Sequence, residues 1–372
     1  MQIVFGQCHK VKLKIDWPIG REEEIMNASL TENNIRSTAY GTKPFVDAIG
    51  DVNYKPDMAG NSWFWVGHFE AEGHTLNFMY HVSVLQISKY LPVKMINSVL
   101  SITDETGKIY RHEDRFYRVK SGGVAKDGLQ IHTEQDIVEG DLDTLRIASK
   151  MKAGAIDITI HGKGYPLYCL CTGYFQIAGA PNYQYSFPTM EAAGTLTLES
   201  KTYQVSGMVW FDRQFAHRPK GRKLGNGYNC KWVWMDMHFD NSADKISLFG
   251  VTELASGKEN CWATVLHPDG TQACAGVDPM VKDSFDVWES KSTGMRYPTG
   301  WIVNIPEWDC RLTVKSVMDE QEIAAGNPAG RKYEGASRIK GVYRGKETTG
   351  YCCLELVGGW NETAGKEEYH GK

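Results

Sequence analysis

Short runs in which apolar and polar residues alternate recur along the whole of this 372-residue chain. Alternation with a period of two is typical of a β-strand that buries one face. Helical periodicity is scarce, and the best candidate helix, residues 86–100, is interrupted by Pro92. Gly, Asp and Ser-Lys turn signals join neighbouring runs and predict β-hairpins at 69–78, 101–110, 196–205 and 265–274. The chain is therefore expected to be all-β, of the sandwich or barrel class.

Residues 177–190 interrupt the alternation near the middle of the chain. Pro181 and Pro188 bracket a polar, aromatic stretch there, and proline has no N–H for the ladder of a central strand. We therefore expect this segment to separate two β domains of nearly equal size, 1–186 and 187–372.

The strand predicted at 231–239 has large side chains on both faces. One face is an ordinary core face of Val233, Met235, Met237 and Phe239. Because successive side chains point to opposite faces, the other face carries Trp232, Trp234, Asp236 and His238. A carboxylate in such a strand has either a cross-strand Lys or Arg partner or a functional role.

Two further segments combine aromatic and polar residues. The strand at 206–215 places Trp210 and Asp212 on one face and Phe211 on the other, and a structural ion pair of Asp212 is an alternative to function. The predicted hairpin at 61–82 carries Trp63 and Trp65 on its first strand and Tyr80 and His81 on its second. Core packing explains most of these aromatics, and a single buried histidine is more often a hydrogen-bonded core residue than a catalyst.

Composition narrows the class of partner. Hydrophobic residues make up 42% of the chain, with 11 Trp, 18 Tyr and 13 Phe, which is ample for a folded core. A formal net charge of -4 argues against a nucleic-acid partner, which would need a basic patch. No segment is apolar enough for an export signal or a membrane span, so we expect a cytoplasmic protein.

Cofactor and metal motifs are missing from the sequence. HExxH, a P-loop, GxSxG and a GxGxxG after a strand are all absent, and the 11 histidines lack the close spacing of a metal site. The nine cysteines show no CxxC spacing, which is typical of reduced thiols. Cys169 and Cys171 would share a strand face, so a metal or redox pair stays open beside simple packing. We expect neither a cofactor nor a metal.

Several longer segments resemble one known family. "SGMVWFDRQF" (206–215) resembles the Trp-Phe-Asp-Arg-Gln signature of the lipocalin-like family of AttH-like proteins and carotenoid 1,2-hydratases, also called hydroxyneurosporene synthases. "YPTGWIVNIPEWDCRLTV", "DEQE" and "YEGASRIKGVYRGKETTGYCCLELVGGW" are similar to that family's ending, in which a Tyr-x-Glu-Gly strand leads to a Gly-Tyr-x-x-Leu close. "NSWFWVGHF" resembles its Trp-rich N-terminal strand. The matches follow the family order over most of the chain.

This resemblance implies two lipocalin-like (calycin) β-barrel domains packed together, with an apolar pocket at or near their junction. The superfamily includes hydratases of isoprenoid double bonds, to which a fungal kievitone hydratase is compared, fungal cyclases that assist Diels–Alder closure, and members without an assigned activity. Trp234 and Asp236 stand where the carotenoid hydratases have an aromatic-x-Asp pair. Those enzymes have a histidine directly before the aspartate that matches Asp212, whereas this chain has Phe211, which weakens the case for a carotenoid substrate.

Hydration of a prenyl-type alkene begins with protonation of a carbon, which a carboxyl group achieves only if burial keeps it protonated. Asp236, beside His238, is the predicted acid, and Asp212 is predicted to orient the water or accept its proton. Indole faces stabilise the resulting cation. The predicted substrate-binding residues are Trp63, Trp65, Tyr80, His81, Trp210, Phe211, Trp232 and Trp234.

Dehydration is the same path reversed. A cyclase that holds a polyene in the pocket needs no dedicated acid and is an alternative. A non-enzymatic carrier of hydrophobic ligands is another. All three readings predict a hydrophobic small-molecule partner.

Overall fold

The computed structural model describes residues 44–86, 94–119, 128–177, 180–217, 229–326 and 330–361. These residues form β-strands and four short 3-10 helices, and they contain no α-helix. The 3-10 helices are η1 Gly50–Val52, η2 Cys169–Cys171, η3 Val281–Asp283 and η4 Pro306–Trp308. The strands before residue 217 are β1 Gly60–Ala71, β2 His74–Gln86, β3 Lys94–Asp104, β4 Ile109–Arg118, β5 Leu129–His132, β6 Asp136–Gly140, β7 Thr144–Met151, β8 Gly154–His161, β9 Leu167–Tyr168, β10 Tyr174–Ile177, β11 Ala180–Leu198 and β12 Lys201–Ala216. The later strands are β13 Cys230–Phe239, β14 Ser242–Glu253, β15 Glu259–Leu266, β16 Gln272–Gly276, β17 Phe285–Glu289, β18 Arg296–Ile305, β19 Cys310–Ser316, β20 Glu322–Ile323, β21 Lys332–Tyr343 and β22 Lys346–Gly358.

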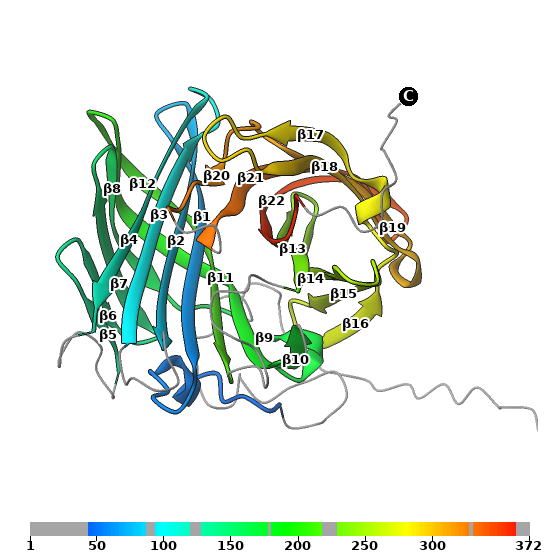
Figure 1. The fold of residues 1–372 in the computed structure, drawn as a ribbon, viewed down its shortest axis with the longest axis horizontal. Coiled ribbons are helices and arrows are strands. Elements are labelled where there is room, and N and C mark those ends of the chain that lie inside the picture. Colours follow the sequence, from blue (N-terminus) through cyan, green and yellow to red (C-terminus); the bar gives the residue numbers. More distant parts are fainter. Residues whose placement is uncertain are drawn as a thin grey trace, which may run out of the picture.

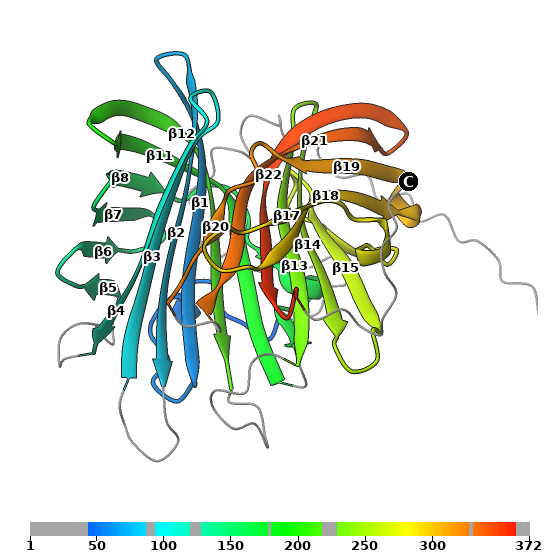
Figure 2. The same ribbon diagram turned by 45° about the horizontal axis from the view of Figure 1, so that its top comes forward.

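Two antiparallel sheets contain all of these strands (Figure 1). The first sheet has the order β4-β3-β2-β1-β12-β11-β8-β7-β6-β5, with β9 and β10 paired to β11. The second has the order β16-β15-β14-β13-β22-β21-β19-β18-β17, with β20 paired to β21. Each sheet curls around its own apolar core, and Figures 1 and 2 show the two curled sheets side by side. The expected all-β fold of two lipocalin-like units is confirmed.

A buried arginine connects distant strands of the first sheet across its curl. Arg115 of β4 donates through one guanidinium nitrogen to Asp136 of β6 at 2.8 Å and to Ser149 of β7 at 2.9 Å. Ser149 in turn donates to the same Asp136 oxygen at 2.7 Å. These bonds satisfy a charge pair that burial would otherwise penalise strongly.

The central strands are buried on both faces. On β1, Trp63 and Trp65 point into the first core, whereas Phe64 belongs to a separate cluster of buried residues between the sheets. On β13, Val233 points into the second core and Trp234 into the cluster between the sheets. The two sheets therefore pack against each other through their outward faces, and the predicted two-faced strand at 231–239 is confirmed as β13.

All four predicted hairpins are present. They are β1–β2, β3–β4, β11–β12 and β15–β16. In the first of them the turn residues Glu72 and Gly73 both have positive φ, 52° and 80°. Turns of that handedness match the twist of the strands that they join.

The candidate helix at 86–100 is wrong over the part that the structure describes. Residues 94–100 lie in β3, paired with β2 on one side and β4 on the other, and 87–93 lie outside the described residues. Ile96 and Leu100 of β3 point into the first core, while Val99 points into the interface between the sheets. Because both faces of β3 are buried, its apolar residues do not alternate strictly, and the run imitates a helical period.

The prediction that 177–190 forms no central strand is also wrong. β11 runs through this segment between β12 on one side and β10, β9 and β8 on the other. The register with β12 shifts between Phe187 and Met190, so Pro188 lies at a bulge, where no ladder hydrogen bond is required. The first sheet extends to Ala216 and the second begins at Cys230, so the predicted boundary after residue 186 falls inside β11.

No helix among the described residues is long and apolar enough to cross a membrane.

Candidate active site

The interface between the sheets places polar groups of both outward faces opposite one another. On the first sheet, Val66 of β1 pairs with Trp210 of β12 on one side and Met79 of β2 on the other. On the second sheet, Trp234, Asp236 and His238 of β13 share a face, because their positions differ by two residues. β22 and β21 lie beside β13 in that order and extend the same face.

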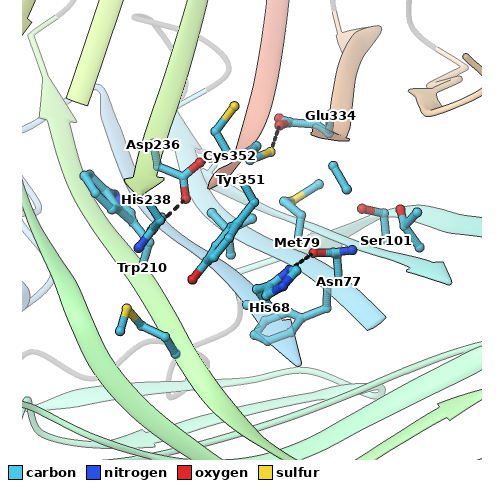
Figure 3. Close-up of a pocket in the computed structure, with 17 residues that line it drawn as sticks. His68, Asn77, Met79, Ser101, Trp210, Asp236, His238, Glu334, Tyr351 and Cys352 are labelled. Carbon is cyan, nitrogen blue, oxygen red and sulfur yellow. Dashed lines mark hydrogen bonds and ion pairs between the residues drawn. The ribbon is translucent and has the colours of Figure 1, made fainter. Parts of the chain in front are cut away.

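A cavity lies between these two faces (Figure 3). Its walls come from β1, β2, β3 and β12 of the first sheet and from β13, β21 and β22 of the second. The open space between the walls is about 440 Å³ and continues into solvent. The enclosed part of this space has room for about two water molecules. The polar and aromatic groups of its wall include His68, Asn77, Trp210, Asp236, His238, Glu334 and Tyr351.

Asp236 contributes a buried carboxyl group to the cavity wall. Its side chain accepts a hydrogen bond from the backbone N–H of Cys353 on β22 at 2.5 Å. The β13–β22 ladder pairs Met235 with Leu354 and resumes at His238 with Tyr351, so regular pairing is interrupted where this side chain enters. Burial raises the pKa of Asp236 well above its usual value, and the nearby Asp212 adds to the effect. The carboxyl therefore tends to hold its proton near neutral pH.

His238 lies beside Asp236, with its Nε2 3.7 Å from a carboxyl oxygen. Burial lowers the pKa of His238 well below its usual value, and Lys245 acts in the same direction. Its Nδ1 is buried and has no hydrogen-bond partner among the described residues. The site thus places an imidazole beside a carboxyl group, and burial favours the neutral form of each.

Three rings form a stack that crosses the interface. Tyr351 stacks on His238 with centroids 4.7 Å apart and on His68 of the first sheet with centroids 4.0 Å apart. His68 is fixed by its Nδ1, which is 2.7 Å from the Asn77 side-chain oxygen. Trp210 meets His238 edge to face with centroids 5.6 Å apart. The cavity thus has aromatic walls from both sheets, as Figure 3 shows.

Asp212 lies on the same outward face but does not line the cavity. Its carboxyl accepts hydrogen bonds from the Trp210 indole at 2.5 Å, the Ser186 hydroxyl at 2.5 Å and the Gln184 amide at 2.8 Å. Burial raises its pKa to about 7 in spite of these donors. Asp212 therefore fixes the Trp210 ring that borders the cavity and has little capacity left for a water molecule.

The structure places four of the predicted substrate-binding residues elsewhere. Trp63, Trp65, Tyr80 and Phe211 point into the first core, on the opposite side of their strands from the cavity. Trp65 stacks between Tyr80 and Phe211, with centroids 5.8 Å and 5.1 Å apart. Alternation along β1, β2 and β12 separates these residues from Trp210 and the other cavity residues.

The remaining predicted residues, Trp234, Trp232 and His81, lie at the interface beside the cavity without lining it. Trp234 donates to Ser247 at 3.1 Å and meets Trp210 edge to face at 6.1 Å. Trp232 donates to Glu355 at 2.9 Å.

Sequence reasoning assigned no role to Glu334, Tyr351 or His68, which all line the cavity. A signal for the first two was available, because they belong to the "YEG" and "GYCCL" segments of the C-terminal resemblance. His68 shares a face with Phe64 and Val66 by simple alternation in "FWVGH". Within the described residues no group of three or more His, Cys, Asp or Glu side chains is arranged to hold a metal ion.

Comparison with known proteins assigns the chain to a family. A family model described as AttH-like matches residues 46–359. The chain belongs to the AttH-like family. The carotenoid hydratase part of the resemblance stays a prediction, because the matching model is that of the AttH-like proteins.

Two curated relatives of this AttH-like chain carry names that state an activity. Dehydratase asqC of Emericella nidulans is 25% identical over 232 residues, which are 60% of this chain and 64% of that protein. Kievitone hydratase of Fusarium solani subsp. phaseoli is 23% identical over 229 residues, 60% of this chain and 62% of that protein. The matches thus span somewhat less than two thirds of each relative.

Among solved structures, a putative AttH from Nitrosomonas europaea superposes with a TM-score of 0.72 at 17% identity. The superposition covers 86% of this chain and 99% of that one. At this level of identity the likeness concerns the fold.

Proposed function

We propose that this protein is a hydro-lyase that adds water to, or removes it from, a carbon–carbon double bond of a hydrophobic, prenyl-type small molecule. The observation that carries the proposal is the Asp236 carboxyl, buried and aimed into an aromatic cavity between the sheets. The names of the two curated relatives, a dehydratase and a hydratase, support the same class of reaction.

Asp236 would supply the proton. In hydration its O–H bond breaks as a new C–H bond forms at the less substituted alkene carbon, which leaves a tertiary carbocation and a carboxylate. Burial favours the protonated carboxyl before the step, as a general acid near neutral pH requires. The neutral His238 beside it can accept a hydrogen bond from the carboxyl or exchange a proton with it.

The aromatic walls would stabilise the cation. The Trp210 ring borders the cavity, and the negative face of an indole attracts a desolvated cation by about 2 kcal/mol. Asp212 then acts as a positioning residue, because it holds the Trp210 indole by the hydrogen bond described above. A water molecule in the cavity completes hydration when its oxygen bonds to the cation and it gives up a proton.

The test is incubation of the purified protein with prenylated phenolics, isoprenoid alkenes and the matching tertiary alcohols in ¹⁸O-labelled water, read by mass spectrometry. A product heavier than an alkene by one labelled water, or lighter than an alcohol by one water, is expected. Asp236→Asn should reduce that turnover by at least about a hundredfold. A product of unchanged mass and altered retention would indicate a cyclase instead, and bound but unchanged ligand would indicate a carrier.

A further inference from the structure

A hydro-lyase needs a second proton-transfer group besides its acid. Water that attacks a cation must lose a proton, and in dehydration the leaving hydroxyl must gain one. Asp212 is unsuited to this role, because three donors occupy its carboxyl and it does not line the cavity.

Glu334 of β21 is a second carboxyl in the cavity wall. Glu334 as a whole is 2% exposed, and its side chain is fully buried. Cys353 of the intervening strand β22 joins the two acids, since its backbone N–H donates to Asp236 and its thiol donates to Glu334 Oε2 at 3.7 Å. Figure 3 shows Asp236 and Glu334 on either side of Cys352, the residue before Cys353.

A lysine forms an ion pair with Glu334. Lys332 Nζ lies 2.5 Å from Glu334 Oε1 and 3.8 Å from Glu355, and it also donates to His81 Nδ1 at 3.1 Å. Burial raises the pKa of Glu334 well above its usual value, and the Lys332 ammonium offsets only part of that rise. Because Lys332 sits at Oε1, the other oxygen, Oε2, is the one that remains near Cys353 and the cavity.

We infer that Glu334 is the second catalytic carboxyl of this site, the group that takes the proton from the attacking water in hydration and returns it to the leaving hydroxyl in dehydration. This inference rests on the proposed function. The steps balance: Asp236 loses a proton to carbon, Glu334 gains one from water, and one water molecule is added in total. A proton moving from Glu334 to Asp236 through cavity water restores both groups.

Glu355 provides a matched control for this role. It lies 3.8 Å from the same Lys332, is directly opposite Glu334 in the β21–β22 register and contacts the Glu334 carboxyl, but it does not line the cavity. Its change to glutamine keeps an oxygen that can accept the Trp232 hydrogen bond. A purely structural role in the ion-pair network would make Glu334→Gln and Glu355→Gln alike, whereas a catalytic role would separate them.

The experiment compares wild type, Glu334→Gln, Glu355→Gln and Asp236→Asn on one alkene of the panel that wild type hydrates, in D₂O. Glu334→Gln should lower kcat at least about a hundredfold. Its recovered alkene should nevertheless gain deuterium, because Asp236 still protonates carbon reversibly. Glu355→Gln should keep kcat within about threefold, and Asp236→Asn should abolish both hydration and deuterium uptake.

Equal kcat losses in the two glutamine variants, or an unchanged kcat in Glu334→Gln, would overturn the role of Glu334 while leaving the proposed function intact. A wild type that hydrates or dehydrates nothing in the panel would instead contradict the proposed function, and this inference with it. If Glu334→Gln does not fold, Glu334→Asp is the alternative variant, because it retains a carboxyl and the Lys332 pair. Glu334→Asp should fold and keep more than a tenth of the wild-type kcat. A complete loss of kcat in Glu334→Asp would also contradict the proposal.

Discussion

At the scale of single residues, the site is defined by how burial changes the protonation of its acids. The Asp236 carboxyl accepts hydrogen bonds from the backbone N–H groups of Cys353 and of Asp236 itself, and His238 Nε2 lies 3.7 Å from it. A buried acid of this kind favours its neutral form, which is the opposite of the usual surface carboxylate. The burial that suits Asp236 to donate a proton therefore also lowers the stability of the folded protein whenever the Asp236 carboxyl ionises.

This predicts the effect of pH on Asp236→Asn. The folded protein holds the Asp236 proton more tightly than the unfolded chain, whose carboxyl has a pKa of about 3.8. The contribution of Asp236 to the stability of the folded protein is therefore largest below that pH, and it falls by about 1.4 kcal/mol per pH unit as the pH rises toward the raised pKa. Asp236→Asn avoids this loss, so its melting temperature should exceed that of wild type at pH 8 and match it near pH 4. A less stable variant at pH 8 would show that ionised Asp236 has a stabilising partner.

Asp212 predicts a different outcome, because its carboxyl accepts hydrogen bonds from three side chains. Asp212→Ala leaves the Trp210 indole, the Ser186 hydroxyl and the Gln184 amide without their acceptor, and should lower the free energy of unfolding by about 3 kcal/mol. Asp212→Asn keeps one oxygen, and Gln184 can rotate to offer its Oε1, which has no hydrogen-bond partner in the part of the chain that the structure describes. Urea unfolding at pH 7 should give Asp212→Asn a free energy of unfolding within about 1 kcal/mol of that of wild type. Equal losses of stability in Asp212→Ala and Asp212→Asn would contradict this account.

At the scale of elements, β13 and β22 set the geometry of the site. Asp236 and His238 come from β13, and Tyr351 and Cys353 come from β22. Close approach of the two strands depends on Gly350 of β22, where an added Cβ would lie 2.0 Å from the carbonyl oxygen of His238. That oxygen belongs to the backbone and cannot move alone.

Gly350→Ala is therefore expected to push β22 away from β13 and to destabilise the protein by about 2 kcal/mol. Because Tyr351 follows directly, turnover should fall as well. Gly276→Ala is the control, since a Cβ at Gly276 of β16 meets nothing within 4 Å. The free energy of unfolding in denaturant and kcat should be measured for both variants, and both should fall only in Gly350→Ala. Unchanged stability and turnover in Gly350→Ala would mean that the two strands adjust freely.

Sequence patterns predicted the elements well where a turn separates two strands, as at Glu72 and Gly73. They failed where both faces of a strand are buried. In β3, core residues such as Ile96 and interface residues such as Val99 are both apolar, so the period of two is lost. In β11, Pro188 was taken as the end of a sheet, but a bulge accommodates it within the sheet.

At the scale of the whole molecule, the cavity lies between two sheets and inside neither core. The alternation of β13 correctly grouped Asp236 with His238, because that grouping depends on one strand alone. It could not show which face of β1 meets β13, because both faces of β1 carry aromatic residues. The structure shows that the face with His68 meets β13 and that the face with Trp63 and Trp65 does not. Contacts such as the His68–Tyr351 stack join residues from different sheets, and no local pattern encodes them.

The two sheets also meet at a pair of thiols. Cys171 of η2, on the first sheet, and Cys274 of β16, on the second, have sulfur atoms 2.8 Å apart and are separated by 103 positions in sequence. The contact with Cys171 lowers the pKa of the Cys274 thiol, which favours the thiolate that attacks a disulfide.

Oxidised glutathione is therefore expected to form a Cys171–Cys274 disulfide, with release of two molecules of reduced glutathione. Such a link should stabilise the protein by about 2–4 kcal/mol. Peptide mapping without reductant and unfolding before and after oxidation would measure both effects. Cys310→Ser, which changes a buried thiol of the second core, should still form the link, whereas Cys274→Ser should not. Failure of wild type to form it would show that the sulfurs do not reach bonding geometry.

The interrupted ladder between β13 and β22 has one more consequence, which concerns spectroscopy. The Cys353 N–H donates to the carboxyl of Asp236 instead of to a strand carbonyl, so the resonance of this amide is sensitive to the charge on that carboxyl. Selective ¹⁵N-cysteine labelling yields one backbone amide signal for each of the nine cysteines. A titration of the Cys353 signal would therefore follow the ionisation of Asp236 directly, in the resting protein and without any substrate.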